Sequence, residues 1–515
     1  MMSGGLVYRI AYINNSVYSD AASAQSSRVM TVAESRGMIY DRNMNPIVNN
    51  TAHTLIAVNP TAEAKEALKK NLSAEDYKKI EQRIAKNKPF YAVCDSYKGE
   101  CEDIIKTEIY DRYSENGNAS HIIGYTDSDG NGVSGIEKAF DSLMKEYSGT
   151  LSIRYTATAD GSVLGRNNFK LSDDNYNSAG GLVLTIDSRM QRICEDAMKR
   201  NGIEKGAVVV LDAQTSEILA LASAPAFDVN NLQSSLNDKN LPFLNRAVNA
   251  YSVGSVFKPI VSAAALEKNI PTDTIFNCMG YATVNGVRFN CHKKTGHGKN
   301  DMIAATAESC NVYFIELGEL VGAESIILKA SQMGFGKETA LCYTIISSAG
   351  NLPTADEIDS APALANLSFG QGSLLATPLQ IAAAYCVFTN GGYYKEPYIL
   401  KSIVNENGTE VQYYKSEVNN KVLTESICKE IRTMLKETVE SGSGRLAKPM
   451  ATGAAGKTAT AETGKYINGE KSVHTWFAGY YPAKDPKYVI VVFKENGSTS
   501  STDCAPVFRD IADAF

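Results

Sequence analysis

The chain has 515 residues, which predicts two or three domains. A hydrophobic content of 44% and a charged content of 21% are typical of a globular protein and argue against a disordered chain. The net charge is −6 and the sequence contains no basic stripe, so we expect no nucleic-acid partner.

The first residues are apolar only over positions 5–13, whereas a membrane-spanning helix needs about 20 apolar residues. This stretch is either a short amphipathic start or the outer end of a signal-anchor helix. Residues 14–35 are rich in Ser, Ala and polar residues and are interpreted as a stalk.

Three glycine-containing motifs mark the N-terminal part. They are Arg-Gly-Met-Ile-Tyr-Asp-Arg-Asn at residues 36–43, His-Ile-Ile-Gly-Tyr at 121–125 and Gly-Val-Ser-Gly-Ile-Glu at 132–137. Residues 63–86 are rich in Ala, Lys and Glu and predict helices. No catalytic constellation is found before about residue 200, so we interpret this part as a structural scaffold.

From residue 181 the pattern changes to apolar strands separated by a helical region. The predicted strands are 182–187, 206–212, 217–223, 476–480 and 487–494, with another through Lys457, and the predicted helices include 188–199 and 505–515. Residues 206–223 indicate a hairpin. The pattern by itself indicates an α+β domain.

The stretch from Tyr251 to Pro259 contains Ser255 and Lys258. Residues three apart share a helix face, so the lysine amine can lie beside the serine hydroxyl. A serine becomes a good nucleophile when a base takes its proton, and a lysine held partly neutral can be that base.

Two further motifs follow in the chain. Ser309-Cys310-Asn311 lies in the helix-like run 301–320, and Lys457-Thr458-Ala459 lies in a predicted strand. Ser-x-x-Lys, Ser-x-Asn and Lys-Thr-Gly in this order form the signature of penicillin-binding proteins and serine β-lactamases. In this chain Ala459 replaces the glycine.

Together with the N-terminal motifs, the chain resembles class B penicillin-binding proteins from about residue 34 to its end. The resemblance implies the α+β penicillin-binding/transpeptidase fold, a five-stranded antiparallel sheet flanked by helices, preceded by an elongated pedestal. We expect residues 1–20 to be the end of a truncated membrane anchor or stalk, 21–180 the pedestal domain and 181–515 the transpeptidase domain.

The resemblance also implies residue roles. Ser255 is the nucleophile and Lys258 its base, Ser309 passes a proton to the leaving amine, and Asn311 holds Lys258 and a substrate amide. Lys457 supplies positive charge beside Ser309. Thr458, Ala459 and Thr460 form the substrate-binding strand, whose two threonine hydroxyls bind the substrate carboxylate, and the backbone amides of Ser255 and Thr460 form the oxyanion hole.

The implied activity is a peptidoglycan D,D-transpeptidase that cross-links stem peptides ending in D-Ala-D-Ala and is acylated by β-lactams, with D-Ala-D-Ala carboxypeptidase activity on the side. The implied partners are lipid-linked nascent glycan and a polytopic membrane glycan polymerase. The implied location is the bacterial cell membrane, with a single N-terminal anchor and an extracytoplasmic catalytic domain. No cofactor is needed for this catalysis.

Two alternatives remain at this stage. A fast β-lactamase needs a dedicated deacylation base, for which Glu357 is the nearest candidate in order, in surroundings that do not match. A penicillin-binding sensor or scaffold without turnover is the other alternative.

Among the ten cysteines, three combine with a histidine as a candidate metal site. Cys278, Cys291, His297 and Cys310 would suit structural zinc, with His292 as a spare ligand. Part of this set resembles the zinc site of elongation-type class B enzymes. The alternatives are a Cys278–Cys291 disulfide or free thiols, and Cys94 and Cys101 are close enough in sequence to bridge a small loop.

Overall fold

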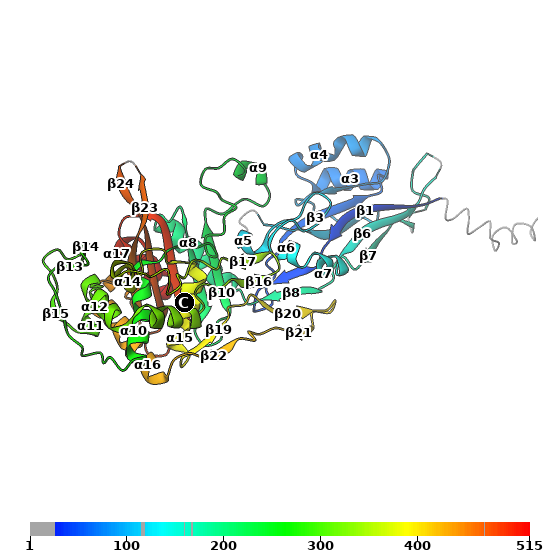
Figure 1. The fold of residues 1–515 in the computed structure, drawn as a ribbon. Coiled ribbons are helices and arrows are strands. Elements are labelled where there is room, and N and C mark those ends of the chain that lie inside the picture. Colours follow the sequence, from blue (N-terminus) through cyan, green and yellow to red (C-terminus); the bar gives the residue numbers. More distant parts are fainter. Residues whose placement is uncertain (1–25, 115–118, 159, 166–167, 468) are drawn as a thin grey trace, which may run out of the picture.

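The computed structural model describes residues 26–114, 119–158, 160–165, 168–467 and 469–515. Figure 1 shows an elongated molecule, with a slender N-terminal arm on one side and a larger body on the other. The anchor or stalk expected at residues 1–20 lies outside the described residues. Within the described ranges, no helix combines the length and the apolar character that crossing a membrane requires.

A five-stranded antiparallel sheet is the centre of the larger body. Its order is β10-β9-β25-β24-β23, so two early strands meet three late ones, as expected from the sequence. The strands are β9 (Gly206–Asp212), β10 (Ile218–Ala224), β23 (Ala455–Ile467), β24 (Glu470–Tyr481) and β25 (Tyr488–Gly497).

Helices cover both faces of this sheet, which explains why β9 is apolar from Ala207 to Leu211. Val209 and Leu211 join a core with α10 (Lys258–Glu267), α15 (Pro378–Thr389) and α16 (Glu425–Glu440). Val208 and Val210 join the opposite core with α8 (Ser188–Arg200) and α18 (Ala505–Ala514). Successive side chains of a strand point to opposite faces, so a strand covered on both faces shows no polar alternation.

The N-terminal arm contains two three-stranded sheets and a helix pair (Figure 1). One sheet is β1 (Ser27–Ser35), β6 (Gly149–Thr156) and β7 (Lys170–Asp174). The other is β4 (Phe90–Val93), β3 (Thr51–Val58) and β5 (Ile104–Asp111), against which α3 (Ala62–Asn71) and α4 (Ala74–Ala85) pack.

A four-stranded sheet joins the arm to the body, in the order β2-β8-β20-β21. The strands are β2 (Met38–Tyr40), β8 (Gly181–Leu184), β20 (Leu400–Val404) and β21 (Glu410–Tyr413). The predicted strand at 182–187 is therefore shorter than expected. It lies outside the five-stranded sheet, because β2 pairs with one of its edges and β20 with the other.

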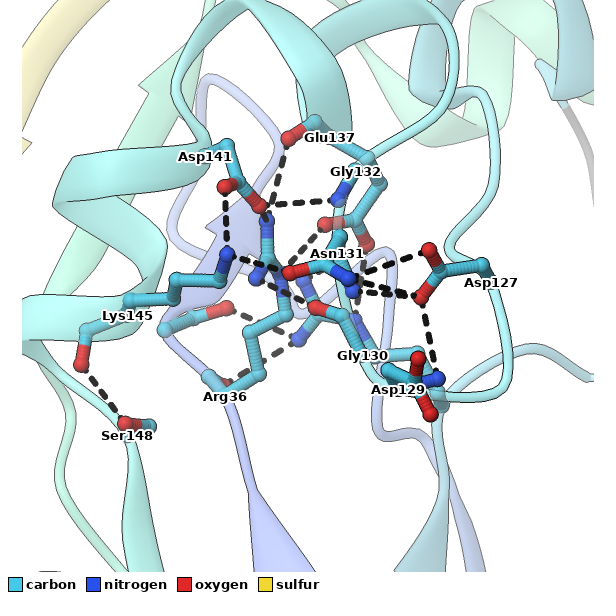
Figure 2. Close-up of polar contacts among 12 residues, drawn as sticks. Arg36, Asp127, Asp129, Gly130, Asn131, Gly132, Glu137, Asp141, Lys145 and Ser148 are labelled. Atoms are coloured by element: carbon cyan, nitrogen blue, oxygen red, sulfur yellow. Dashed lines mark hydrogen bonds and ion pairs between the residues drawn. The ribbon is translucent and has the colours of Figure 1, made fainter.

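Two motifs of the arm and the segment after β5 meet at one buried carboxylate, that of Glu137, whose side chain is 0% exposed. Arg36 donates from Nε to Glu137 Oε2 at 2.8 Å and from Nη2 to Asp141 Oδ1 at 2.7 Å (Figure 2). Arg112, at the end of β5, donates from Nε to Glu137 Oε1 at 2.8 Å. These three segments are held together by paired charges, in keeping with the scaffold interpretation.

The remaining elements are short and surround these sheets. The helices are α5 (Ser120–Ile123), α6 (Gly135–Ala139), α7 (Asp141–Glu146), α9 (Leu232–Ser235), α13 (Ala323–Gln332), α14 (Ala361–Ser368) and α17 (Ser500–Asp503). The strands are β11 (Tyr251–Ser252), β12 (Phe276–Cys278), β13 (Tyr281–Val284), β14 (Val287–Asn290), β15 (Gly298–Asn300), β16 (Thr339–Cys342), β17 (Ile345–Ser347), β18 (Leu375–Ala376), β19 (Tyr393–Lys395) and β22 (Asn419–Lys421).

Candidate active site

Ser255 lies at a cleft of about 1080 Å³ in the larger body. It stands in a 3₁₀ turn, η2 (Gly254–Phe257), which runs directly into α10. The sequence predicted an α-helix here, but residues three apart are eclipsed in a 3₁₀ turn, so Ser255 and Lys258 still lie on one side. Ser255 is half-buried, while Lys258 is fully buried beneath it.

The amine of Lys258 is held by the second motif. Its Nζ donates to the backbone oxygen of Ser309 at 2.8 Å, to Ser309 Oγ at 3.3 Å and to Asn311 Oδ1 at 2.8 Å. Within the described part of the chain, no hydrogen bond joins it to Ser255. Burial lowers the pKa of Lys258 to about 8, so a fraction of its amine is neutral at physiological pH.

The second motif sits at a break between two helices, where the sequence predicted one run over residues 301–320. The first helix, α11 (Met302–Ala307), ends before Ser309, which has a left-handed φ of 57°. The second, α12 (Asn311–Val321), begins at Asn311, and Cys310 Sγ accepts a bond from the Tyr313 amide at 3.4 Å as its cap. The break turns Ser309 and Asn311 toward Lys258.

The third motif lies on edge strand β23. Lys457 is fully buried and donates from Nζ to the backbone oxygen of Thr458 at 3.0 Å. Burial, and then the charge of Lys258, lowers the pKa of Lys457. Thr458, Ala459 and Thr460 all line the cleft. The structure thus brings together all eight residues predicted for catalysis and substrate binding.

The substitution of Ala459 for glycine is accommodated by Gly254. A Cβ atom placed on Gly254 would lie 3.3 Å from the Ala459 methyl and 3.1 Å from that of Ala461. Gly254 also has a φ of 66°, which disfavours any side chain. The residue before the nucleophile is therefore small because β23 passes directly over it.

Several cleft residues were missed in the sequence. Gly254 donates from its amide to the Gly370 oxygen at 2.7 Å, which places the loop 368–372 beside the nucleophile. Asn366, Phe369 and Gln371 of this region line the cleft, as does Ser443. The one local signal in the sequence is the pattern Gly370-Gln371-Gly372, because glycines allow a close approach of the backbone.

Glu357 is exposed, and its Oε2 accepts a bond from the Thr354 amide at 2.8 Å. It is not among the described residues that line the cleft. The base that a β-lactamase requires is therefore not supplied by Glu357 in this arrangement.

The candidate metal ligands form a compact cluster next to the second motif. The ligand atoms of Cys278, Cys291, His297 and Cys310 all lie within 4.8 Å of one another. A tetrahedral zinc ion with bonds of about 2.0–2.3 Å places its ligand atoms about 3.3–3.8 Å apart. His297 Nε2 is buried without a hydrogen-bond partner among the described residues. The donor set therefore fits zinc.

The cysteines form no disulfide bonds. All ten cysteines are free, so neither the Cys278–Cys291 nor the Cys94–Cys101 disulfide is formed. A hydrogen bond between Cys291 and Cys310 lowers the pKa of Cys291 and raises that of Cys310, so this pair favours one thiolate.

Comparison with known proteins decides the family. The penicillin binding protein transpeptidase domain model matches residues 206–513, more than half of the chain. The chain belongs to this family. Its relatives and the motifs of its arm identify it as a class B penicillin-binding protein, as expected from the sequence.

Two curated relatives show how far the similarity of this penicillin-binding protein extends. Stage V sporulation protein D of Bacillus subtilis is 32% identical over 412 residues, which is 76% of this chain. Peptidoglycan D,D-transpeptidase MrdA of Haemophilus influenzae is 32% identical over 375 residues, or 64% of this chain. The matches span 61% and 56% of those relatives, so this chain covers less than two thirds of either.

A solved peptidoglycan synthase complex contains a chain of the same fold. The TM-score is 0.72 at 24% identity, covering 100% of this chain and 96% of that one. The likeness extends over the arm as well as the body, which supports the expected pedestal-plus-transpeptidase fold.

Proposed function

We propose that the protein is a serine D,D-transpeptidase that cross-links peptidoglycan stem peptides ending in D-Ala-D-Ala. The observation that carries this proposal is the buried Lys258 amine, which bridges Ser309 and Asn311 beneath the half-buried Ser255 at a wide cleft. A nucleophile, a base of lowered pKa and a proton donor are the parts that acyl transfer needs.

In the proposed reaction Ser255 Oγ attacks the carbonyl of the penultimate D-Ala while Lys258 takes its proton. The C–N bond breaks, and Ser309 passes its proton to the departing D-Ala amine while it takes up the proton held by Lys258. An amine of a neighbouring stem then attacks the Ser255 ester, which forms the cross-link and restores the serine. Attack by water instead gives the carboxypeptidase side reaction.

The oxyanion of both tetrahedral states would be held by the backbone amides of Ser255 and Thr460. One such donor stabilises the transition state by about 3–4 kcal/mol. The position of β23 therefore matters as much as any side chain, and the strand runs so close to Gly254 that a Cβ atom there would crowd Ala459 and Ala461.

Lys457 would supply positive charge beside Ser309. Two buried lysines disfavour each other's protonation, in line with the lowered pKa of Lys457. A substrate carboxylate at Thr458 and Thr460 would favour the charged amine of Lys457 and leave Lys258 as the neutral one. Substrate binding would then make Lys457 the positive charge of the site and Lys258 the base.

The proposal extends to the surroundings of the enzyme. Residues 21–180 would form the pedestal and 181–515 the transpeptidase domain, anchored in the bacterial membrane through the segment that includes residues 1–20, with the catalytic domain outside. Lipid-linked nascent glycan would be supplied by a polytopic membrane polymerase. The solved synthase complex of the same fold supports this pairing.

We further propose that Cys278, Cys291, His297 and Cys310 hold a structural zinc ion. When bound, zinc would fix the segment before Ser309, because Cys310 is the residue between Ser309 and Asn311. The ion takes no part in acyl transfer, for which the protein's own side chains and amides suffice.

The test is acylation by a fluorescent penicillin, followed by mass spectrometry of the peptide that carries the label. We expect a stable adduct on Ser255 that is absent in Ser255→Ala and retained in Ser501→Ala, a control at another serine of the cleft. Label that disappears within seconds would support a β-lactamase instead. A folded wild-type protein that takes no label would support the scaffold alternative.

A further inference from the structure

Ser443 connects the third motif with the end of α11, the helix that precedes the second motif. It lies between α16 and a 3₁₀ turn, η3 (Arg445–Ala447), and it lines the cleft. Its Oγ lies 2.8 Å from Thr458 Oγ1 on β23 and donates to the backbone oxygen of Ala307, at the end of α11, at 3.1 Å.

The Ala307 oxygen has a second donor. The last carbonyls of a helix have no partner within the helix, and the Ser443 backbone amide donates to this one at 3.0 Å. The neighbouring Gly442 is packed so tightly that a Cβ atom would come within 2.4 Å of the same oxygen. The backbone of the loop is thus fixed without help from the Ser443 hydroxyl.

A serine hydroxyl has one proton and two acceptor lone pairs. While Ser443 donates to Ala307, it can only accept from Thr458, and the Thr458 proton is then used in the bond to Ser443. When Ser443 donates to Thr458 Oγ1 instead, the Thr458 proton is free for an acceptor in the cleft. The Ala307 oxygen keeps a hydrogen-bond donor in this change, because the Ser443 backbone amide remains bonded to it.

We propose that Ser443 is a positioning residue that turns the Thr458 hydroxyl toward the carboxylate of the substrate. This inference rests on the proposed function, in which Thr458 binds that carboxylate. Ser443 thereby contributes to recognition of substrates that end in a free carboxylate and contributes little when that charge is missing.

Two acyl donors separate this role from a structural one. They are an N-acyl-D-alanyl thioglycolate with a free carboxylate and its methyl ester, and release of the thiol gives kcat/KM for each. In Ser443→Ala we expect kcat/KM to fall about tenfold for the acid, as for a lost hydrogen bond to a charged group. For the ester we expect a change of less than about twofold.

Three variants complete the experiment. Ser443→Thr keeps the hydroxyl and should restore the preference for the acid. Ser441→Ala is the matched control, because among the described residues that hydroxyl bonds only to Glu437 and is not part of the cleft lining. In a Thr458→Val background, Ser443→Ala should have no further effect on the acid.

Equal losses for acid and ester in Ser443→Ala would overturn the proposal in favour of a structural role, and so would unchanged values for both. Failure of the proposed function would look different. In that case wild-type protein would release no thiol from either donor and its Ser255 would not be acylated by penicillin.

Discussion

Lys258 and Asn311 are joined by a hydrogen bond of 2.8 Å from Nζ to Oδ1, across 53 positions of the chain. The bond holds a buried amine at the first turn of α12, away from solvent. An amine in this position is easier to deprotonate than one in water, because burial disfavours its charged form. The rate of Ser255 acylation should therefore depend on whether Lys258 is protonated.

We expect penicillin acylation to rise with pH. Burial lowers the pKa of Lys258 to about 8, and only the neutral amine accepts the Ser255 proton. The second-order rate constant should increase about tenfold per pH unit on the acid side and level off above the pKa. Rates from pH 5.5 to 9.5, with near-ultraviolet circular dichroism as a check of folding, measure this. A flat profile would contradict Lys258 as the base.

Gly254→Ala should slow acylation more than its loss of stability explains. The methyl group would meet Ala461 at 3.1 Å and Ala459 at 3.3 Å, and so push β23 away from Ser255. Gly202→Ala is the matched control, since its φ of 67° is nearly that of Gly254 and nothing lies within 4 Å. Both should lose about 1–2 kcal/mol of stability from left-handed strain.

The two glycine variants are compared by thermal unfolding and by penicillin acylation. We expect at least about a tenfold slower rate for Gly254→Ala alone, because the oxyanion donor on β23 would be displaced. Equal rates in both variants would show that β23 is not positioned through Gly254.

Removal of the Glu137 carboxylate should destabilise the protein strongly. Glu137→Ala leaves the partly buried guanidinium groups of Arg36 and Arg112 without the fully buried carboxylate that they share. Breaking a buried ion pair from one side costs about 3–5 kcal/mol. Urea unfolding measures the loss, with the exposed Glu146→Ala as a control that should change stability by less than about 0.5 kcal/mol. A small effect of Glu137→Ala would mean that water replaces the carboxylate.

Zinc should be found in the protein at one ion per chain. Elemental analysis after purification under reducing conditions measures it, and a chelator should lower the melting temperature because bound metal contributes to folding. His297→Ala should lose the ion, whereas His292→Ala should keep it, since only His297 belongs to the compact cluster. Metal-free protein with the same melting temperature before and after chelation would rule out the site.

The parts of the site that could be predicted are those encoded by short spacings. Ser255 and Lys258 are three positions apart, so either helical geometry brings them to one side. The apolar runs of β9 and β10 likewise predicted a buried hairpin, because a short turn forces neighbouring strands to pair.

The parts that could not be predicted depend on distant contacts. Residues 301–320 contain no proline and no glycine before Gly318, so nothing local marks the break at Ser309 except the capping ability of Cys310. Ser443 reaches the site only because α16 ends against Ala307, a meeting of segments 136 positions apart. The pairing of β8 with β2 and β20 could not be predicted either, because these strands are far apart in the sequence.

The pairing of β2 with β8 determines which truncated fragments of the protein can stay soluble. Residues 181–184 are fully buried, and the three residues of β2 cover one edge of that strand. A fragment that begins at Gly181 would expose this apolar edge, a surface on which strands of other molecules add. A soluble catalytic fragment therefore has to carry Met38–Tyr40 as well, either in the same chain or as an added peptide.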